Sequence, residues 1–563
     1  MPMDKEKLNE RLRQFDKNTV QFMNEQPPKF VDKDKPAESA SLFSQASINS
    51  HEYIEAKDKI RQETLADAPR ITTRSAYSPR DNASNLVDEL SYNKLNEMEQ
   101  AGLKEAKLKE TPWSDDYWGI YKGMLGARYA DPDFPESYDW KTNADYIIAH
   151  PAIDILESRS ATRINRLSPA EKYDALLGDT EGSLTQAMWM EGKRYYDANG
   201  EVESWMGLCH GWATAAYMLP RPSQAITLLS PDNIPIKFFP SDIKALGTLL
   251  WANAASRTKF IGGRCNDKEP ETDAETGRIT SERCFDTNPG TWHLAIVNQI
   301  GVAKRSFVLD ATFDYEVWNQ PAYAYEYTYF NPQTRQAVDQ LADATISLDD
   351  YTNDKFKRFR SHKTRSVVGI AMTVTYVVET WPRQNETDSP ENDSVQEVVY
   401  EYDLELDENG VIIGGEWYRN RHPDFLWTPA KDAKAQTQFE NSATGSWNNV
   451  LRPVPKSWRA AAKQAAIQEK AAPLAKIVEQ LIEFSTSSSD RGVPSSTGDN
   501  STDTDTSTDN NGSTDTNNAH NAGSENNNTN NLGNSGNTSS NHNNASPLSN
   551  LLNWIRNLFG RMF

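Results

Sequence analysis

The sequence predicts an α+β protein in which a helix that begins at a cysteine packs on an antiparallel sheet. Helix-start signals, long β-branched runs and an Asn-Gly turn between alternating segments support this prediction. At 563 residues the chain exceeds one compact core, so several structural units are expected. Aromatic residues make up 10% of the chain, which is enough to fill a large core.

The first part of the chain, residues 1–110, is rich in Lys, Glu, Asp and Asn and has few apolar clusters. Such a composition buries little apolar surface. We interpret it as a poorly packed leader, a pro-segment or an arm wrapped over the main body. Aromatic density rises from residue 111, so we expect the main domain to span residues 111–460.

Three helices of the main domain are predicted from their end signals. Ser168 caps a helix with Pro169 in its first turn, and Glu171 completes a capping box. The run "CHGWATAAYM" predicts a helix over residues 209–218, which a following proline stops. Another helix is expected to begin at Ser241.

Three segments have strand patterns. Residues 291–312 contain two apolar alternating runs and predict a hairpin, and residues 365–381 are β-branched and long. In residues 398–418 tyrosine and leucine alternate with acidic residues, so the two kinds occupy opposite faces. Asn409-Gly410 then closes a second hairpin.

The second hairpin also loosely fits the ligand spacing of a calcium loop. Positions one, three, five, six and twelve hold Glu405, Asp407, Asn409, Gly410 and Glu416. A calcium loop of this kind joins two helices, whereas strands are expected on both sides here. A plain hairpin is therefore the favoured interpretation.

The C-terminal part divides into three segments. Residues 461–485 carry an apolar stripe and predict a helix. Residues 486–545 are rich in Asn, Ser and Thr and predict a disordered tether. Residues 546–563 predict an amphipathic helix, which could lie on a membrane, dock on a partner or fold back onto the body.

The charge of the chain argues against a nucleic-acid partner. Against 59 basic residues stand 80 acidic ones, giving a formal charge of -21 and a pI near 5.0, which repels phosphate backbones and anionic lipids. No apolar run reaches the roughly 18 residues of a membrane span. No Sec-type signal peptide is visible, because the first residues lack an apolar region.

The sequence contains three cysteines. A polar, charged span separates Cys265 from Cys284, and a disulfide between them would close a loop of about 20 residues, worth about 3 kcal/mol. This pairing leaves Cys209 free, either as an inert core thiol or as a reactive one. The alternative is three reduced thiols in a cytosolic protein.

Cys209 opens its predicted helix, where unpaired backbone N–H groups and the helix dipole lower a thiol pKa. A thiol nucleophile also needs an imidazole base. The neighbouring His210 points about 100° away around the helix. Three other histidines fall in the leader or the tether: His51, His520 and His542.

His293 begins an expected strand that runs into a turn at Gly301-Val302. If the turn is symmetric, His293 faces Asp310 with Cβ atoms about 5 Å apart. A carboxylate at this spacing orients an imidazole and stabilises its charged form. We therefore predict Cys209, His293 and Asp310 as nucleophile, base and orienter, although His beside Asp also occurs as a structural hydrogen bond.

Several blocks of the sequence, in order over about 113–430, resemble the transglutaminase elicitor family, whose oomycete members are secreted calcium-dependent transglutaminases. The blocks are "GLCHGWA" at 207–213, "GGRCN" at 262–266, "WHLAIVN" at 292–298, "FVLDAT" at 307–312, "YEVWNQPAYAY" at 315–325, "GGEW" at 414–417 and "HPDFLW" at 422–427.

The resemblance implies a papain-like transglutaminase core with the nucleophile at Cys209, the base at His293 and the carboxylate at Asp310. It implies acyl transfer from a glutamine side chain to a lysine amine, with exposed Gln and Lys of proteins as substrates. The backbone N–H of Cys209 would stabilise the oxyanion, with the indole of Trp205 or Trp212. Secretion and a calcium requirement are further implications.

Two rival functions remain open at this point. A cysteine peptidase or glutamine deamidase would use the same three residues, with water in place of the amine. A non-catalytic surface adhesion module would make Cys209 dispensable.

Overall fold

The structure is a computed structural model that describes residues 4–31, 81–254, 257–263, 270–281, 284–311 and 317–487. These residues belong to one compact unit, Met1–Ser488. Beyond Ser487, the predicted tether and terminal helix lie outside the described residues.

Three helices predicted from the sequence are present among the described residues. The capping box at Ser168 is formed, and the cysteine-led helix spans the predicted residues. The helix expected at Ser241 begins one residue earlier. The α-helices are α1 (Lys5–Lys17), α2 (Thr19–Met23), α4 (Leu95–Gln100), α5 (Trp140–Ala149), α6 (Ala152–Glu157), α7 (Ala161–Asn165), α8 (Pro169–Leu177), α9 (Ser183–Asn199), α10 (Cys209–Met218), α11 (Pro240–Ala254), α12 (Pro289–Ile296), α13 (Leu341–Ala344), α14 (Lys456–Ala466) and α15 (Ala475–Ser487).

Eleven strands of the described residues form one sheet, in the order β1-β11-β10-β7-β6-β13-β5, with β12 on β11, β2 and β8 on β7, and β9 on β10. The pairings are antiparallel. The strands are β1 (Lys29–Val31), β2 (Glu105–Lys107), β5 (Thr258–Gly262), β6 (Phe307–Asp310), β7 (Asn319–Asn331), β8 (Gln336–Val338), β9 (Thr345–Ser347), β10 (Ser366–Val378), β11 (Ser394–Leu406), β12 (Ile412–Trp417) and β13 (Phe425–Pro429). A separate hairpin pairs β3 (Ile226–Leu229) with β4 (Pro235–Phe238).

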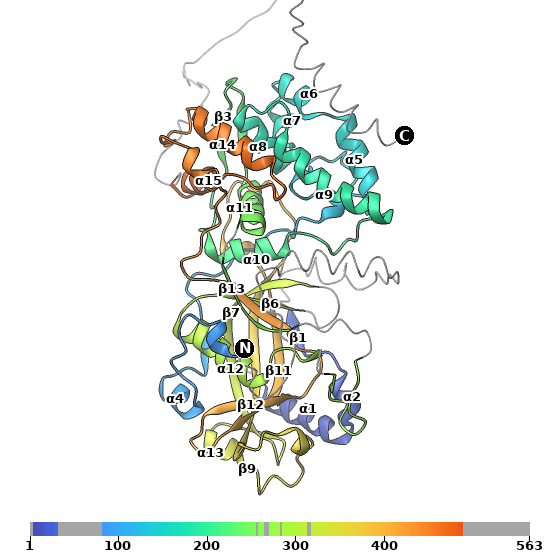
Figure 1. Ribbon diagram of the computed structural model, residues 1–563, viewed down its shortest axis with the longest axis vertical. Helices are drawn as coiled ribbons and strands as arrows, with labels where there is room; N and C mark the ends of the chain where they lie inside the picture. The colour runs from blue at the N-terminus through green and yellow to red at the C-terminus, as the bar shows by residue number, and fades with distance from the viewer. Residues whose placement is uncertain are drawn as a thin grey trace, which may run out of the picture. The chain divides into compact units, whose positions relative to one another are not determined.

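Helix α10 lies between the helices and the sheet (Figure 1). One side packs on α11, and the other contacts β6 and β7. The close approach to α11 depends on Gly211, where a Cβ would come within 2.3 Å of the Thr248 carbonyl oxygen. Helices α8 and α15 cover α11 in turn. The predicted α+β class, with the cysteine helix packed on an antiparallel sheet, is confirmed.

The hairpin predicted over residues 291–312 is wrong. Its first half is α12, followed by a π-helical stretch over Val297–Val302, and only its second half is a strand, β6. Asn288 caps α12 through a 2.8 Å bond from the Gly290 N–H, and Pro289 occupies its first turn. Because α12 is buried on all sides, its helical period is absent from the sequence.

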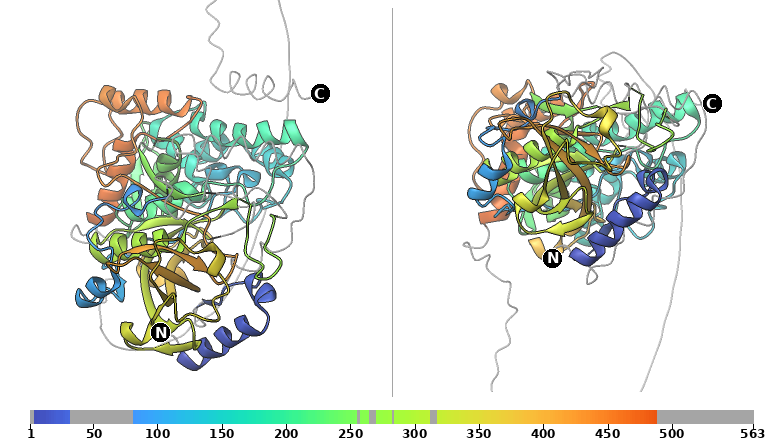
Figure 2. Two further views of the ribbon diagram at one scale, coloured as in Figure 1. Left: turned by 60° about the horizontal axis from the view of Figure 1, so that its bottom comes forward. Right: turned by 90° about the horizontal axis from the view of Figure 1, so that it is seen from below.

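The N-terminal segment is packed on the sheet, so the interpretation as a poorly packed leader fails for residues 4–31. Leu8, Leu12 and Phe15 of α1 are fully buried, and the Phe15 ring stacks on Tyr418 at 4.5 Å. Figure 2 shows α1, in dark blue, next to the sheet. The helix covers the acidic face of β11, where Arg11 donates to Glu401 at 2.6 Å. This packing fits the alternative of an arm wrapped over the body.

We expect Arg11→Met to lower the free energy of unfolding by about 1–2 kcal/mol, because Glu401 is buried and loses one of its charged donors. Arg419 still bonds Glu401, which limits the loss. Arg13→Met on the exposed side of α1 is the matched control. Urea denaturation would measure both, and equal effects would contradict the account.

Candidate active site

Cys209 is the first residue of α10 and is held against the loop that carries Tyr117. The Leu208 N–H donates to the Tyr117 carbonyl oxygen at 2.6 Å. Gly207 makes this approach feasible, since a Cβ there would lie 2.5 Å from the same oxygen. The start of α10 is thus fixed by backbone contacts, and Cys209 is only 6% exposed.

The sulfur of Cys209 has two hydrogen-bond partners at the start of β7. The Asn319 side-chain amide donates to Sγ at 3.4 Å, and Sγ donates to the Val317 carbonyl oxygen at 3.6 Å. Asn319 is itself oriented, because its Oδ1 accepts from the Trp427 indole at 2.8 Å. This leaves the Asn319 N–H group directed at the sulfur.

Burial raises the pKa of the Cys209 thiol to about 11, despite the hydrogen bonds from Asn319. The carboxylates of Glu379 and Asp310 raise the pKa further. The sequence prediction of a lowered pKa at the helix start is wrong for this conformation. Desolvation outweighs the helix dipole, which acts only over the first turn.

Asp310 lies at the end of β6, directly opposite Asn319 in the sheet register. It is fully buried, and its Oδ1 accepts the Trp318 N–H at 3.0 Å. The Trp318 ring meets Tyr117 edge-on at 5.4 Å. Asp310 therefore orders the segment that covers the Cys209 sulfur.

Glu379 is a second buried carboxylate close enough to the thiol to influence its pKa. Both of its oxygens accept from the Gln320 side-chain amide, at 2.8 and 3.0 Å. Burial raises the pKa of Glu379 to about 7, in spite of the bond from Gln320. A group with this pKa can take up and release a proton near neutral pH.

His293 lies elsewhere, inside the core between α12 and the sheet. Its Nδ1 is 2.9 Å from the Tyr402 hydroxyl, and its ring meets Tyr327 edge-on at 4.9 Å. The Nε2 atom is buried, and the part of the chain that the structure describes offers it no hydrogen-bond partner. Burial lowers the pKa of His293 to about 3, whereas an adjacent carboxylate would raise it.

The structure brings Cys209 and Asp310 together but not His293. Asn319, which touches the sulfur, and Tyr327, which touches the imidazole, are eight residues apart on β7, or about 26 Å of strand. The predicted opposition of His293 and Asp310 is therefore wrong. Its physical cause is the helix found where a strand was expected.

The two indoles predicted as oxyanion donors already have acceptors. Trp212 donates to the Trp113 carbonyl oxygen at 3.0 Å, and Trp205 donates to the carboxylate of Glu203. Trp212 is fully buried, so its N–H serves the packing of α10. The backbone N–H of Cys209 remains the predicted oxyanion donor.

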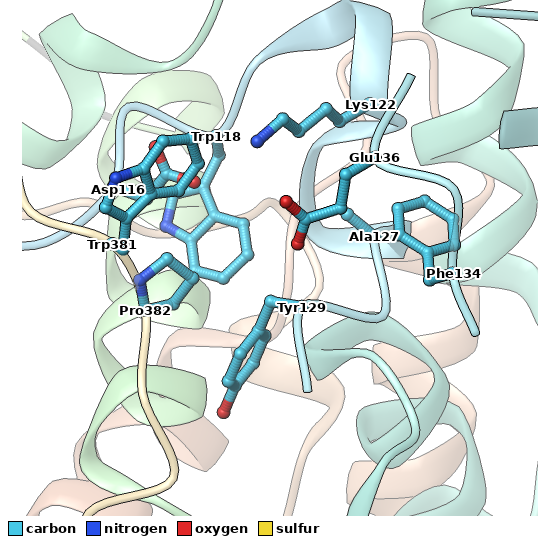
Figure 3. A pocket seen from close by; sticks show the side chains of 9 residues that line it. All are labelled: Asp116, Trp118, Lys122, Ala127, Tyr129, Phe134, Glu136, Trp381 and Pro382. Atoms are coloured by element: carbon cyan, nitrogen blue, oxygen red, sulfur yellow. The ribbon is translucent and has the colours of Figure 1, made fainter. Parts of the chain in front are cut away.

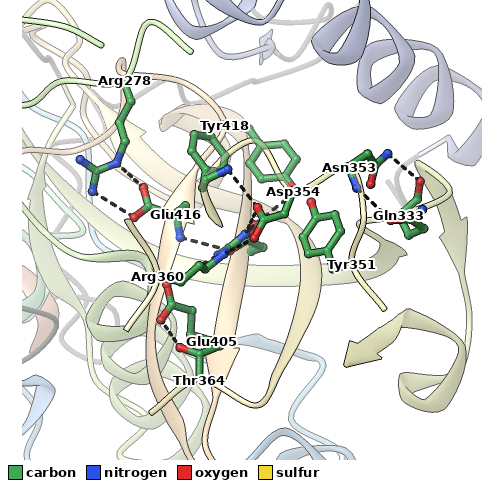
Figure 4. Close-up of polar contacts among 12 residues, drawn as sticks. Arg278, Gln333, Tyr351, Asn353, Asp354, Arg360, Thr364, Glu405, Glu416 and Tyr418 are labelled. Atoms are coloured by element: carbon green, nitrogen blue, oxygen red, sulfur yellow. Dashed lines mark hydrogen bonds and ion pairs between the residues drawn. The ribbon is translucent and has the colours of Figure 1, made fainter. Parts of the chain in front are cut away.

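The residues with calcium-loop spacing do not fit a calcium ion. Glu416 is paired with Arg278, at 2.6 Å, and Glu405 lies beside Arg360 and Thr364 (Figure 4). An Asp407 oxygen instead accepts the N–H groups of the turn. The described residues hold no cluster of three or more His, Cys, Asp and Glu side chains suited to a metal. The hairpin interpretation of this segment is confirmed by the pairing of β11 with β12.

Comparison with known families gives this site its context. The family model described as transglutaminase elicitor matches residues 87–459, more than half of the chain. The chain belongs to the transglutaminase elicitor family. The resemblance carried by the sequence blocks is thereby confirmed, and the match includes Cys209, His293 and Asp310.

Among solved structures, the chain is similar to the GP42 transglutaminase from Phytophthora sojae. The two chains are 19% identical with a TM-score of 0.42, and the match covers 68% of this chain and 92% of the other. No curated protein matches this member of the transglutaminase elicitor family. Within the described residues, no helix has the length and hydropathy to cross a membrane.

Sequence reasoning missed three residues of the site. Asn319 and Gln320 stand in the "VWNQP" block, which marked the family without assigning either residue a role. Glu379 directly follows the apolar run of β10. The signal that the sequence offered was this single acidic residue at the end of an apolar strand. None of the three stands at a nucleophile-base spacing that sequence alone could detect.

Proposed function

We propose that the protein is a transglutaminase that transfers the acyl group of a glutamine side chain through Cys209. The observation that carries the proposal is the Cys209 sulfur at the start of α10, held by Asn319 beside Asp310. Membership of the transglutaminase elicitor family supports the reaction class. Asp310 acts as a positioning residue for the segment over the sulfur.

The reaction begins when the Cys209 thiol loses its proton and the sulfur attacks the glutamine amide carbon. We assign the proton acceptor to Glu379, which is bonded to Gln320, the residue after the Asn319 that contacts the sulfur. Its pKa of about 7 suits proton transfer. The C–N bond then breaks and ammonia leaves with the proton. An amine attacks the thioester, the C–S bond breaks, and the amine proton returns to the sulfur.

Because the thiol in this conformation is covered and its pKa is high, the segment at residues 317–319 must move before attack. Moving it admits water to the sulfur and lowers the desolvation that raises its pKa. The backbone N–H of Cys209 then lies where the oxyanion of the tetrahedral intermediate forms.

The test of the proposal follows two products in one reaction. The full chain is incubated with a glutamine-containing peptide and a labelled primary amine, and amine incorporation and ammonia release are both measured. Incorporation supports the transglutaminase, and ammonia alone selects the glutamine deamidase. If neither product forms, with or without calcium, the proposal fails.

We expect His293→Gln to keep amine incorporation per folded molecule within about twofold at pH 8, because the imidazole contacts Tyr402 and Tyr327 in the core, about 26 Å of strand from the residue that touches the sulfur. The substitution should instead change acid stability. The lowered pKa means that the unfolded state takes up a proton below pH 6.5 that the folded state refuses until about pH 3.

Stability of the wild type therefore falls as the pH drops from 6.5 towards 3, and the variant should lose less over that range. Urea unfolding at several pH values measures this difference. A loss of incorporation beyond a hundredfold, with the fold intact, would restore His293 as the base.

The position of His293 also favours a second candidate function, a non-catalytic member of the family. Such a protein needs no imidazole beside its cysteine and would tolerate a buried, protonated thiol. It would bind a partner through its surface, and Cys209→Ala would leave that binding unchanged. The absence of both products in the assay above would select it.

Secretion and calcium belong to the proposal as well. Cys265 lies outside the described residues, so its bond to Cys284 stays a prediction. An intact mass two hydrogens lower than the reduced chain, with the loss mapped to these cysteines, would support export. Since the calcium-loop residues are engaged elsewhere, no step of the reaction is assigned to calcium.

A further inference from the structure

An aromatic cavity opens beside the segment that carries Tyr117 (Figure 3). Its volume is about 190 Å³, far above the roughly 10–15 Å³ that a single water occupies. Six of its lining residues matter here: Asp116, Trp118, Lys122, Tyr129, Glu136 and Trp381.

Two carboxylates and one ammonium group line the cavity. Figure 3 shows the Glu136 carboxylate and the Lys122 ammonium group turned towards its interior. Asp116 is 8% exposed, and burial raises its pKa to about 6 although Lys122 opposes this shift. The cavity thus holds two acidic side chains against one basic one, a balance that favours a cationic ligand.

One wall of the cavity already binds an ammonium group. The Lys122 Nζ lies 4.0 Å from the centroid of the Trp381 ring, a cation–π contact. The ring of Trp118 provides a second apolar wall, and the Tyr129 hydroxyl points away to Asp242. Aromatic faces next to carboxylates are the environment in which proteins recognise alkylammonium groups.

The cavity and the thiol share neighbours. Asp116 and Trp118 flank Tyr117, whose carbonyl oxygen holds the residue before Cys209. Glu379 affects the pKa of Cys209, and Asp116 affects the pKa of Glu379. Trp381 follows Glu379 by two residues. The segments that carry Tyr117 and Glu379 thus extend from the cavity to the surroundings of Cys209.

We propose that this cavity binds the second, non-reacting ammonium group of a diamine or polyamine acyl acceptor, while its other amine resolves the acyl-enzyme at Cys209. The inference rests on the acyl transfer proposed above. It assigns the specificity for the acceptor to Glu136 and Trp381. Lys122 competes with the acceptor for the face of Trp381.

The test compares cadaverine with pentylamine, which matches its chain but carries one charge. At pH 8 the wild type should show a KM about tenfold lower for cadaverine. Glu136→Gln and Trp381→Leu should bring the two KM values together. Lys122→Met should widen the difference between the two KM values, because the Trp381 ring becomes free to bind the acceptor. If Lys122 had a purely structural role, the substitution would leave the difference unchanged.

Glu157→Gln, an exposed carboxylate at the end of α6, is the matched control and should keep the wild-type KM ratio. Calorimetry of the Cys209→Ala chain with cadaverine gives a readout that needs no turnover. The Cys209→Ala chain should bind cadaverine, and the double variant that also carries Glu136→Gln should not.

Equal KM values in the wild type, or a ratio that neither cavity variant changes, would overturn the inference and leave the acyl transfer standing. If the wild type forms no product with any amine, the acyl transfer itself fails and the acceptor role falls with it. If calorimetry then still detects cadaverine binding that depends on Glu136, the cavity is a cation site in a protein that does not transfer acyl groups.

Discussion

Cys209→Ala is expected to abolish amine incorporation and ammonia release, with rates at least roughly 10⁴-fold below the wild type. The thioester needs the sulfur, and Cys209 is the free cysteine of the described residues. Its two hydrogen-bond partners, Asn319 and Val317, belong to the segment that covers the site and offer no substitute nucleophile.

The variant must be shown to fold, because Cys209 is buried and truncation leaves a small cavity. Thr214→Ala on the same helix is the matched control, since Thr214 is equally buried and its hydroxyl bonds the His210 carbonyl oxygen. Thermal unfolding should respond similarly in both variants. Activity retained by Cys209→Ala would remove the nucleophile from the account.

Glu379→Gln is expected to lower kcat by about 10²–10⁴-fold, the range that general-base catalysis contributes. The substitution keeps the shape of the side chain, and an amide oxygen can still accept from Gln320. In the wild type the rate should rise as the pH passes about 7, because only the ionised carboxylate can accept the proton. The variant should lack this rise.

A second readout separates a base from a structural residue. The Glu379 carboxylate raises the pKa of the Cys209 thiol, so Glu379→Gln should lower that pKa. Alkylation of Cys209 by iodoacetamide should then begin at a lower pH, while turnover falls. Glu391→Gln, an exposed acid, is the control. A variant that turns over at the wild-type rate would exclude Glu379 as the base.

The fold class was predictable because several elements have local signals. The capping box at Ser168 and the proline after α10 define their helices without reference to the rest of the chain. The alternation of β11 predicted that Tyr400 and Tyr402 share one face, and both lie in the main core. Such signals are read directly from neighbouring residues.

The site was predictable only in part, because its predicted geometry depended on a segment that is buried on all sides. Residues 289–301 are buried throughout, so apolar and β-branched side chains occur on every side of α12. Asn288 and Pro289 were the helix signal, and the alternating pattern obscured it. This misassignment moved His293 next to Asp310 in the prediction, while Asp310 itself was correctly placed on a strand.

The acidic face of β11 illustrates a similar limit. Alternation predicted that Glu401 and Asp403 lie on one face, which suggests exposure to solvent. They are buried because Arg11, Arg419 and Arg360 neutralise them from three distant parts of the chain. A sequence pattern cannot show which distant arginine pairs with each acid in the folded protein.

The most direct measurement is the mass of the acyl-enzyme. The full chain is mixed with a glutamine-containing peptide in the absence of amine, quenched in acid and digested for mass spectrometry. The account predicts an adduct of the peptide minus ammonia on Cys209, present in His293→Gln and absent in Cys209→Ala. No adduct on the wild-type chain, or an adduct on another residue, would contradict it.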